Sequence, residues 1–130
     1  MSKKKLIVDR YNPNIYPWDL YVVKNFTIDQ VAKLFNLDKN LLKGAWDGIT
    51  ITGVKYKNST DTCTLVLLDA EALRKKDIYY RINTCSHEAQ HYVLDVMGSI
   101  GNENYYADTQ EPYCYLLGWA TECIYRTLIK

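Results

Sequence analysis

The chain lacks the features that mark several large classes of protein. No stretch of it approaches roughly eighteen consecutive apolar residues, so we expect no membrane-spanning segment. Its 16 basic and 15 acidic residues are interspersed and leave a net charge of +1, which indicates neither a nucleic-acid-binding surface nor an acidic one. The apolar piece that follows the lysine run at 3–5 is too short for a signal peptide. We therefore expect a protein that binds neither membranes nor nucleic acid.

Cysteine pairs with metal-ligand spacing are also absent. The four cysteines form no CxxC pair. Two of them fall in segments with helical periodicity, at positions where small apolar residues belong. We interpret Cys63, Cys85, Cys114 and Cys123 as reduced core thiols of a cytoplasmic protein rather than as a disulfide framework.

Histidine is scarce, and both copies lie in one pentapeptide. His87 and His91 are four residues apart, and Glu88 directly follows the first. Residues with this spacing share one face of a helix, with β-carbons about 5–6 Å apart, so both imidazoles can bind a single ion. A catalytic zinc takes three protein ligands and leaves a position for water. Glu88 lies about 100° around the helix, where its carboxylate can act as the general base.

The residues around the pair predict one long helix from about 78 to 97. Asp77 is suited to cap its start, and Gly98 or Gly101 to end it. The histidines fall on the face opposite an apolar stripe, whose repeat of three and four residues is helical. That stripe consists of Ile78, Ile82, Cys85, Ala89, Val93 and Val96.

The third ligand must be a carboxylate or a cysteine, because no histidine remains. A second helix from Glu111 to the C-terminus is predicted by a buried stripe of Tyr113, Leu117, Ala120, Ile124 and Leu128. Another face of that helix carries Glu111, Tyr115 and Glu122, together with Gly118, which would allow close approach to the histidine helix. The candidate carboxylates are Asp95, Glu103, Asp108, Glu111 and Glu122.

The motif HExxH with a following glutamate resembles the gluzincin class of zinc metallopeptidases, the thermolysin-like enzymes. The segment from Glu111 to Trp119 is also similar to the C-terminal helix of short phage-encoded proteins assigned as metallopeptidases. The resemblance covers about residues 78–129. It implies that His87, His91 and Glu111 bind zinc and that Glu88 is the general base, with Glu122 as the alternative third ligand.

The chain departs from the larger gluzincins at one position. They commonly carry an aspartate four residues after the ligand glutamate, and Tyr115 stands there. Tyr115, like Tyr105 and Tyr106, could donate a hydrogen bond to a tetrahedral oxyanion. Asp95, one turn after His91, is either a partner for that imidazole or a solvated surface charge.

The N-terminal half predicts a small sheet. We expect strands at 4–9, 20–23, 48–57 and 62–69, a turn at 11–14, and a helix at 28–36 capped by Thr27. Strands first and helices last indicate an α+β fold, in which residues 1–130 form a single minimal zincin-like domain whose sheet packs against the two helices. An edge of the hairpin at 48–69 could pair with a peptide substrate, or be an ordinary edge.

These features predict a zinc-dependent metallopeptidase that cleaves a peptide or protein substrate. We expect a monomer in the cytoplasm of a bacterium or a phage-infected host cell. Two other functions fit the residues: an interaction protein that zinc stabilises without catalysis, and a zinc hydrolase of non-peptide amides.

Overall fold

Four strands form one mixed sheet in the computed structural model, which describes residues 4–101 and 110–130. The strands are β1 (Ile7–Tyr11), β2 (Asp19–Lys24), β3 (Gly48–Val54) and β4 (Cys63–Leu68), in the order β1-β2-β4-β3. The two outer pairs, β1–β2 and β3–β4, are antiparallel, whereas β2 and β4 are parallel. This order leaves β1 and β3 as the edge strands.

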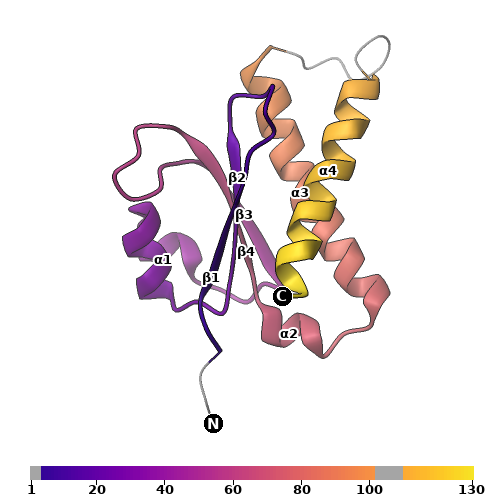
Figure 1. The fold of residues 1–130 in the computed structure, drawn as a ribbon. Coiled ribbons are helices and arrows are strands. Elements are labelled where there is room, and N and C mark those ends of the chain that lie inside the picture. Colours follow the sequence, from indigo (N-terminus) through magenta and orange to yellow (C-terminus); the bar gives the residue numbers. More distant parts are fainter. Residues whose placement is uncertain (1–3, 102–109) are drawn as a thin grey trace.

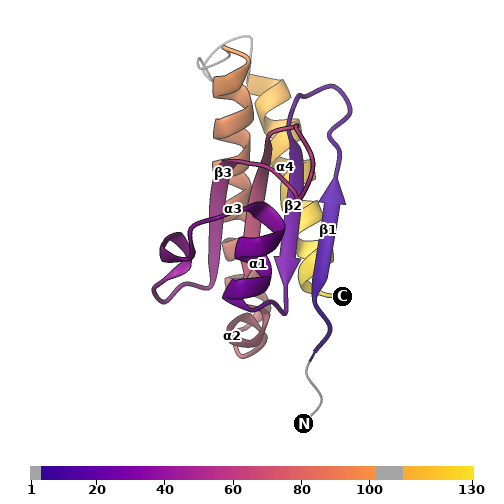
Figure 2. The ribbon, with the colours of Figure 1, turned by 90° about the vertical axis from the view of Figure 1, so that its left-hand side faces the viewer.

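Helices cover both faces of the sheet. The long helices α3 (Ile78–Ser99) and α4 (Gln110–Leu128) lie side by side on one face, and α1 (Ile28–Phe35) lies on the other (Figures 1 and 2). A 3-10 turn, η1 (Lys39–Leu42), and a short helix, α2 (Ala70–Arg74), complete the fold. The fold is therefore α+β, with a small sheet packed against the motif helix and the C-terminal helix.

The alternation of side chains along β2 and β4 explains why both faces are covered. In β2, Leu20 and Val22 pack under α3 and α4, whereas Tyr21 and Val23 pack under α1. Successive side chains of a strand point to opposite faces, so a strand that is apolar at every position needs a cover on each side. All six residues of β4 are buried; five are apolar, and the sixth, Thr64, donates a hydrogen bond to Asp95.

The helix ends follow the signals in the sequence. Thr27 caps α1 in a full capping box with Gln30, and the Asp77 side chain accepts a hydrogen bond from the backbone N–H of Tyr80 at the start of α3. α3 ends before Gly101, whose φ of +75° is a left-handed conformation that glycine adopts without strain. Gly98 remains inside the helix.

The structure corrects several expectations. The first strand begins at Ile7 and includes Tyr11, and neither α2 nor η1 was expected. Ile78 and Ile82 were expected to be buried but are 47% and 45% exposed. The core between α3, α4 and the sheet includes α3 residues only from Cys85 onward, so the first turns of α3 lie outside it. Three cysteines are buried free thiols as expected, but Cys114 is exposed.

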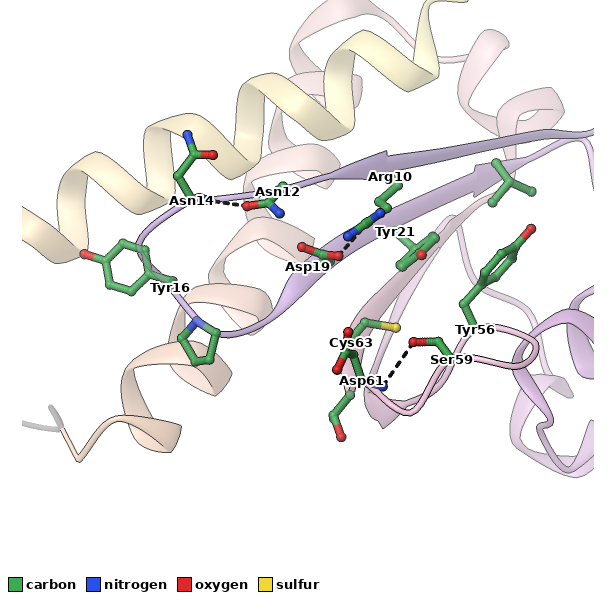
Figure 3. Close-up of a pocket in the computed structure, with 13 residues that line it drawn as sticks. Arg10, Asn12, Asn14, Tyr16, Asp19, Tyr21, Tyr56, Ser59, Asp61 and Cys63 are labelled. Atoms are coloured by element: carbon green, nitrogen blue, oxygen red, sulfur yellow. Dashed lines mark hydrogen bonds and ion pairs between the residues drawn. The ribbon is translucent and has the colours of Figure 1, made fainter.

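A cavity of about 600 Å³ lies on the same face of the sheet as α1, over the part of that face that α1 does not cover (Figure 3). Its walls come from β1, β2 and the loop between β3 and β4. Arg10 and Asp19 face each other there, with Arg10 Nε donating to the carboxylate at 2.6 Å. Because this pair neutralises its own charges, the cavity offers no free cation from Arg10.

No helix within the described ranges 4–101 and 110–130 is both long and apolar enough to cross a membrane.

Tyr92 supplies a test of the core beneath α3. Its side chain is fully buried, and its hydroxyl donates to the Trp18 carbonyl at 2.8 Å. Tyr92→Phe leaves that carbonyl without its donor, so we expect the free energy of unfolding to fall by about 1 kcal/mol. Urea denaturation measures the change. Tyr79→Phe is the matched control, because the Tyr79 side chain is 79% exposed and should change nothing. An equal loss in both variants would show that the hydrogen bond from Tyr92 to Trp18 does not stabilise the fold.

Candidate metal centre

The middle of α3 presents three potential ligands from two of its faces. His87 and His91 lie on the exposed face, whereas Glu88 points between the helix and the sheet and is only 4% exposed. Their ligand atoms all lie within 4.8 Å of one another. Among the described residues this is the one group of three or more histidine, cysteine or acidic side chains that could hold a metal ion.

The two imidazoles have a spacing that suits tetrahedral coordination. Their Nε2 atoms are 3.3 Å apart, and the rings are tilted by 75°. Two nitrogens at the usual Zn–N distance of about 2.0–2.1 Å and at the tetrahedral angle lie about 3.3–3.4 Å from each other. The distance between the two nitrogens is therefore the one that two ligands of a tetrahedral ion would have. Without an ion, one neutral ring can donate a hydrogen bond to the other across the same distance.

Glu88 is held beside this position by the neighbouring strand. The Thr50 hydroxyl of β3 donates to Glu88 Oε1 at 2.9 Å, while Oε2 lies 4.0 Å from His87 Nε2. If both atoms bound one ion at about 2.05 Å, the angle between them would be about 155°, far from tetrahedral. The Glu88 carboxylate therefore lies beside the position that the two imidazoles would share, where it would act as a base rather than as a ligand.

Gly48 allows the close approach that buries Glu88. A β-carbon added at Gly48 would lie 3.1 Å from Glu88 Cγ and 3.3 Å from Thr84 Cγ2. Both distances are shorter than an ordinary van der Waals contact between carbons. A side chain at the first residue of β3 would push α3 away from the strand and separate Glu88 from Thr50.

The electrostatics around Glu88 favour a cation. Burying a carboxylate without a positive partner is costly, and no lysine or arginine within the described residues pairs with Glu88. Nearby, burial and, to a lesser extent, the charge of the Glu88 carboxylate together raise the pKa of the Cys85 thiol to about 12. Cys85 is therefore a neutral core thiol on the far side of the helix from the histidines.

The structure does not bring Glu111 and Tyr115 to the histidines. Both side chains are exposed and line an apolar groove of about 500 Å³ between α4 and the loop that joins β1 to β2. The Tyr92 and Trp119 rings, 6.2 Å apart, mark where α3 and α4 meet. Glu111 precedes Trp119 by eight residues, about 12 Å along the helix and toward the end of α3. The roles of Glu111 as third ligand and Tyr115 as oxyanion donor stay predictions.

The other candidate carboxylates have partners of their own. Glu122 is exposed and pairs with Arg126 at 3.6 Å. Asp95 accepts a hydrogen bond from the buried Thr64 hydroxyl at 2.9 Å, and burial raises the pKa of its carboxyl group above the ordinary value. It is thus held by β4 and is not a solvated surface charge. Four further candidates lie outside the described residues: Glu103, Tyr105, Tyr106 and Asp108.

Gly118 does not have the role expected from the sequence. A β-carbon there would meet no atom within 4 Å, so this glycine does not bring α4 close to α3. The glycine that permits a close approach is Gly48, and the residue that orients the carboxylate is Thr50. The sequence did not predict either role. The alternation of Thr50 with Ile49 and Ile51 was visible, but nothing in the sequence indicated which face of that strand would meet the motif helix.

No protein-family model, no curated protein and no solved structure matches this chain. The interpretation of the site therefore depends on its own geometry.

Gly48→Ala tests the contact between α3 and β3. We expect the free energy of unfolding to fall by about 1–2 kcal/mol, because the added methyl group overpacks against Glu88 and Thr84. Gly118→Ala is the control: its methyl group enters open space within a helix, so stability should rise by about 0.5–1 kcal/mol. Thermal unfolding of both variants measures the difference. A stable Gly48→Ala variant would show that the contact is looser than described.

Proposed function

We propose that the chain is a zinc-dependent hydrolase that cleaves peptide bonds. The observation that carries this proposal is the combination of a 3.3 Å spacing between the two histidine Nε2 atoms and a buried carboxylate whose free oxygen lies 4.0 Å from one of them. A histidine pair that served only for packing would not need an acidic side chain buried beside it, at a cost in desolvation.

Each residue of the group has a distinct role in this proposal. His87 and His91 hold the ion through their Nε2 atoms. A zinc ion supplies Lewis acidity toward the scissile carbonyl and lowers the pKa of a bound water to about 7. Glu88 accepts a proton on Oε2 and returns it to the leaving amine, while Thr50 fixes the other carboxylate oxygen. Since one oxygen is fixed, the carboxylate cannot rotate away from the histidines.

The position of β3 supports a peptide as substrate. β3 is an edge strand, and its first residues, Gly48 and Thr50, lie against Glu88. The outer edge of such a strand presents backbone N–H and C=O groups that an extended peptide can pair with. A peptide added there would run beside the histidine face of α3. An edge strand next to a HExxH helix also supports a minimal zincin-like domain.

A non-catalytic zinc-stabilised interaction protein is the second candidate, and one observation favours it. Five large hydrophobic side chains of α3 on either side of the histidines are at least 40% exposed: Ile78, Tyr79, Tyr80, Ile82 and Leu94. Exposed apolar patches near a polar site are typical of protein contacts. Against this, structural zinc sites commonly have four closed ligands rich in sulfur, and the group here contains no cysteine.

Zinc titration tests the metal centre directly. We expect the chain to bind about one zinc, and His87→Ala or His91→Ala to weaken binding at least about 100-fold, because each removes half of the described nitrogen donors. Isothermal titration calorimetry measures the affinity. Glu111→Gln tests the predicted third ligand: unchanged zinc affinity would show that Glu111 does not reach the ion, in keeping with its place on α4. A loss equal to that of His91→Ala would instead show that Glu111 reaches the ion.

Hydrolysis is tested with Glu88→Gln and a quenched fluorescent peptide library. The variant keeps the shape and the hydrogen bond from Thr50 but cannot take a proton, so the cleavage rate should fall at least about 100-fold while zinc affinity stays within about threefold. Unchanged turnover in Glu88→Gln would overturn the mechanism. If the parent binds zinc but cuts no peptide, amide substrates other than peptides distinguish a different hydrolase from the interaction protein.

A further inference from the structure

Cationic side chains gather at the end of the molecule where β2 and α4 finish and α2 lies (Figure 1). They surround an open cavity of about 560 Å³. Among the described residues that line it, six are basic and none is acidic. The basic residues are Lys4, Lys5, Lys24, Arg74, Arg81 and Lys130.

The local charge differs sharply from that of the whole chain. Two carboxylates just outside the cavity offset part of it: Glu71 pairs with Lys4 at 3.6 Å and Arg74 at 2.5 Å, and Asp9 pairs with Lys130 at 2.8 Å. Six cations minus two carboxylates leave a formal excess of four, against a net charge of +1 for the chain.

The deepest cations are held in place by backbone groups. Lys24 is only 5% exposed, and its ammonium donates to the carbonyls of Leu128 and Lys130 at 2.8 and 2.9 Å. Arg81 donates to three carbonyls at the end of α2, each at 3.0 Å. These bonds cap the two helices, but carbonyl dipoles do not cancel a full positive charge. The two groups therefore keep their positive charge at fixed positions and contribute to the potential in the cavity, although Lys24 itself is buried.

Lys5 has no such partner. The Asn25 side chain, at the end of β2, donates to the backbone carbonyl of Lys5 at 3.1 Å and fixes the backbone beside the cavity. No carboxylate among the described residues pairs with the Lys5 ammonium, which lines the cavity. The cations also repel one another: burial lowers the pKa of Lys24, and the charges of Lys4 and Lys130 lower it further.

We propose that this cavity binds a compact polyphosphate group, either free or as part of a nucleotide. Its formal excess of four positive charges is close to the charge of about −3 to −4 that a di- or triphosphate carries near neutral pH. Lysine and arginine donors that converge from several segments suit tetrahedral phosphate oxygens, which accept from many directions. The volume exceeds what a single phosphate fills, so a chain of two or three phosphates fits better.

This site is independent of the metal centre. Arg81 lies on α3 six residues before His87, which turns it about 120° away from the histidine face. The binding experiment therefore uses metal-free protein in chelator, and repeats it with the His87→Ala/His91→Ala double variant. Because neither histidine lines the cavity, both proteins should bind the anion equally. The hydrolase proposal could fail without affecting this result.

Calorimetric titration of the full chain with sodium tripolyphosphate, in low-salt buffer free of phosphate, tests the proposal. We expect saturable one-to-one binding that Lys5→Gln weakens about fivefold and Lys5→Glu weakens further. Lys55→Gln is the matched control, since it removes the same charge from an exposed residue just beyond β3, at the opposite end of the sheet, and should bind as the parent does.

Several outcomes would overturn the proposal. They are the absence of saturable binding, an equal loss in Lys5→Gln and Lys55→Gln, or tighter binding of an oligonucleotide with the same number of phosphates. A triphosphate and ATP that bind equally would support a site for the phosphates alone, whereas tighter binding of ATP would support a nucleotide.

Discussion

The close packing of α3 against the edge strand β3 is the contact on which the candidate site depends. It exists because Gly48 has no side chain: a β-carbon there would lie only 3.1 Å from Glu88 Cγ, closer than an ordinary contact. Thr50, two residues along the same face of the strand, then donates to the Glu88 carboxylate. One glycine and one threonine thereby convert an acidic residue of a helix into a buried, oriented group beside two imidazoles.

The same contact explains why the two histidines remain exposed. α3 buries one face against α4 and the sheet and turns Glu88 toward β3, which leaves its third face to solvent. A buried histidine pair would be inaccessible to a large substrate, whereas an exposed pair beside an edge strand is open to an extended chain. The Glu88 carboxylate, in contrast, is buried, and in that low-dielectric position it would interact more strongly with a cation bound by the histidines than it would in solvent.

α3 also connects this site with the cationic cavity. Arg81, near the start of the helix, holds the end of α2, while Lys24 holds the end of α4. In both cases a long basic side chain caps a helix from a neighbouring element, and the caps bring positive charge to one end of the fold. The positive charge of the cavity is thus partly a consequence of helix capping. Lys5 is different, because it caps no helix and no carboxylate among the described residues pairs with its ammonium group.

Much of the local structure could be predicted from the sequence, because it depends on neighbours along the chain. Thr27 and Asp77 cap helices through their own following residues, and the spacing of His87 and His91 places both rings on one helix face. The α+β class follows from the order of the segments. The start of α3 at Ile78 was predicted correctly, but the burial of Ile78 and Ile82 was not: both have the right period, yet no other element within the described residues packs over them.

The sequence by itself determined that two imidazoles and a carboxylate would meet on one helix, since a helix sets those distances through its own geometry. Only the tertiary structure decided what stands around them. Which strand lies at the edge, that Gly48 and Thr50 face Glu88, and that Glu111 lines another groove all depend on pairings between distant segments. The distribution of charge also depends on the tertiary structure. Basic and acidic residues are interspersed along the chain, but packing brings six cations from five segments to one cavity.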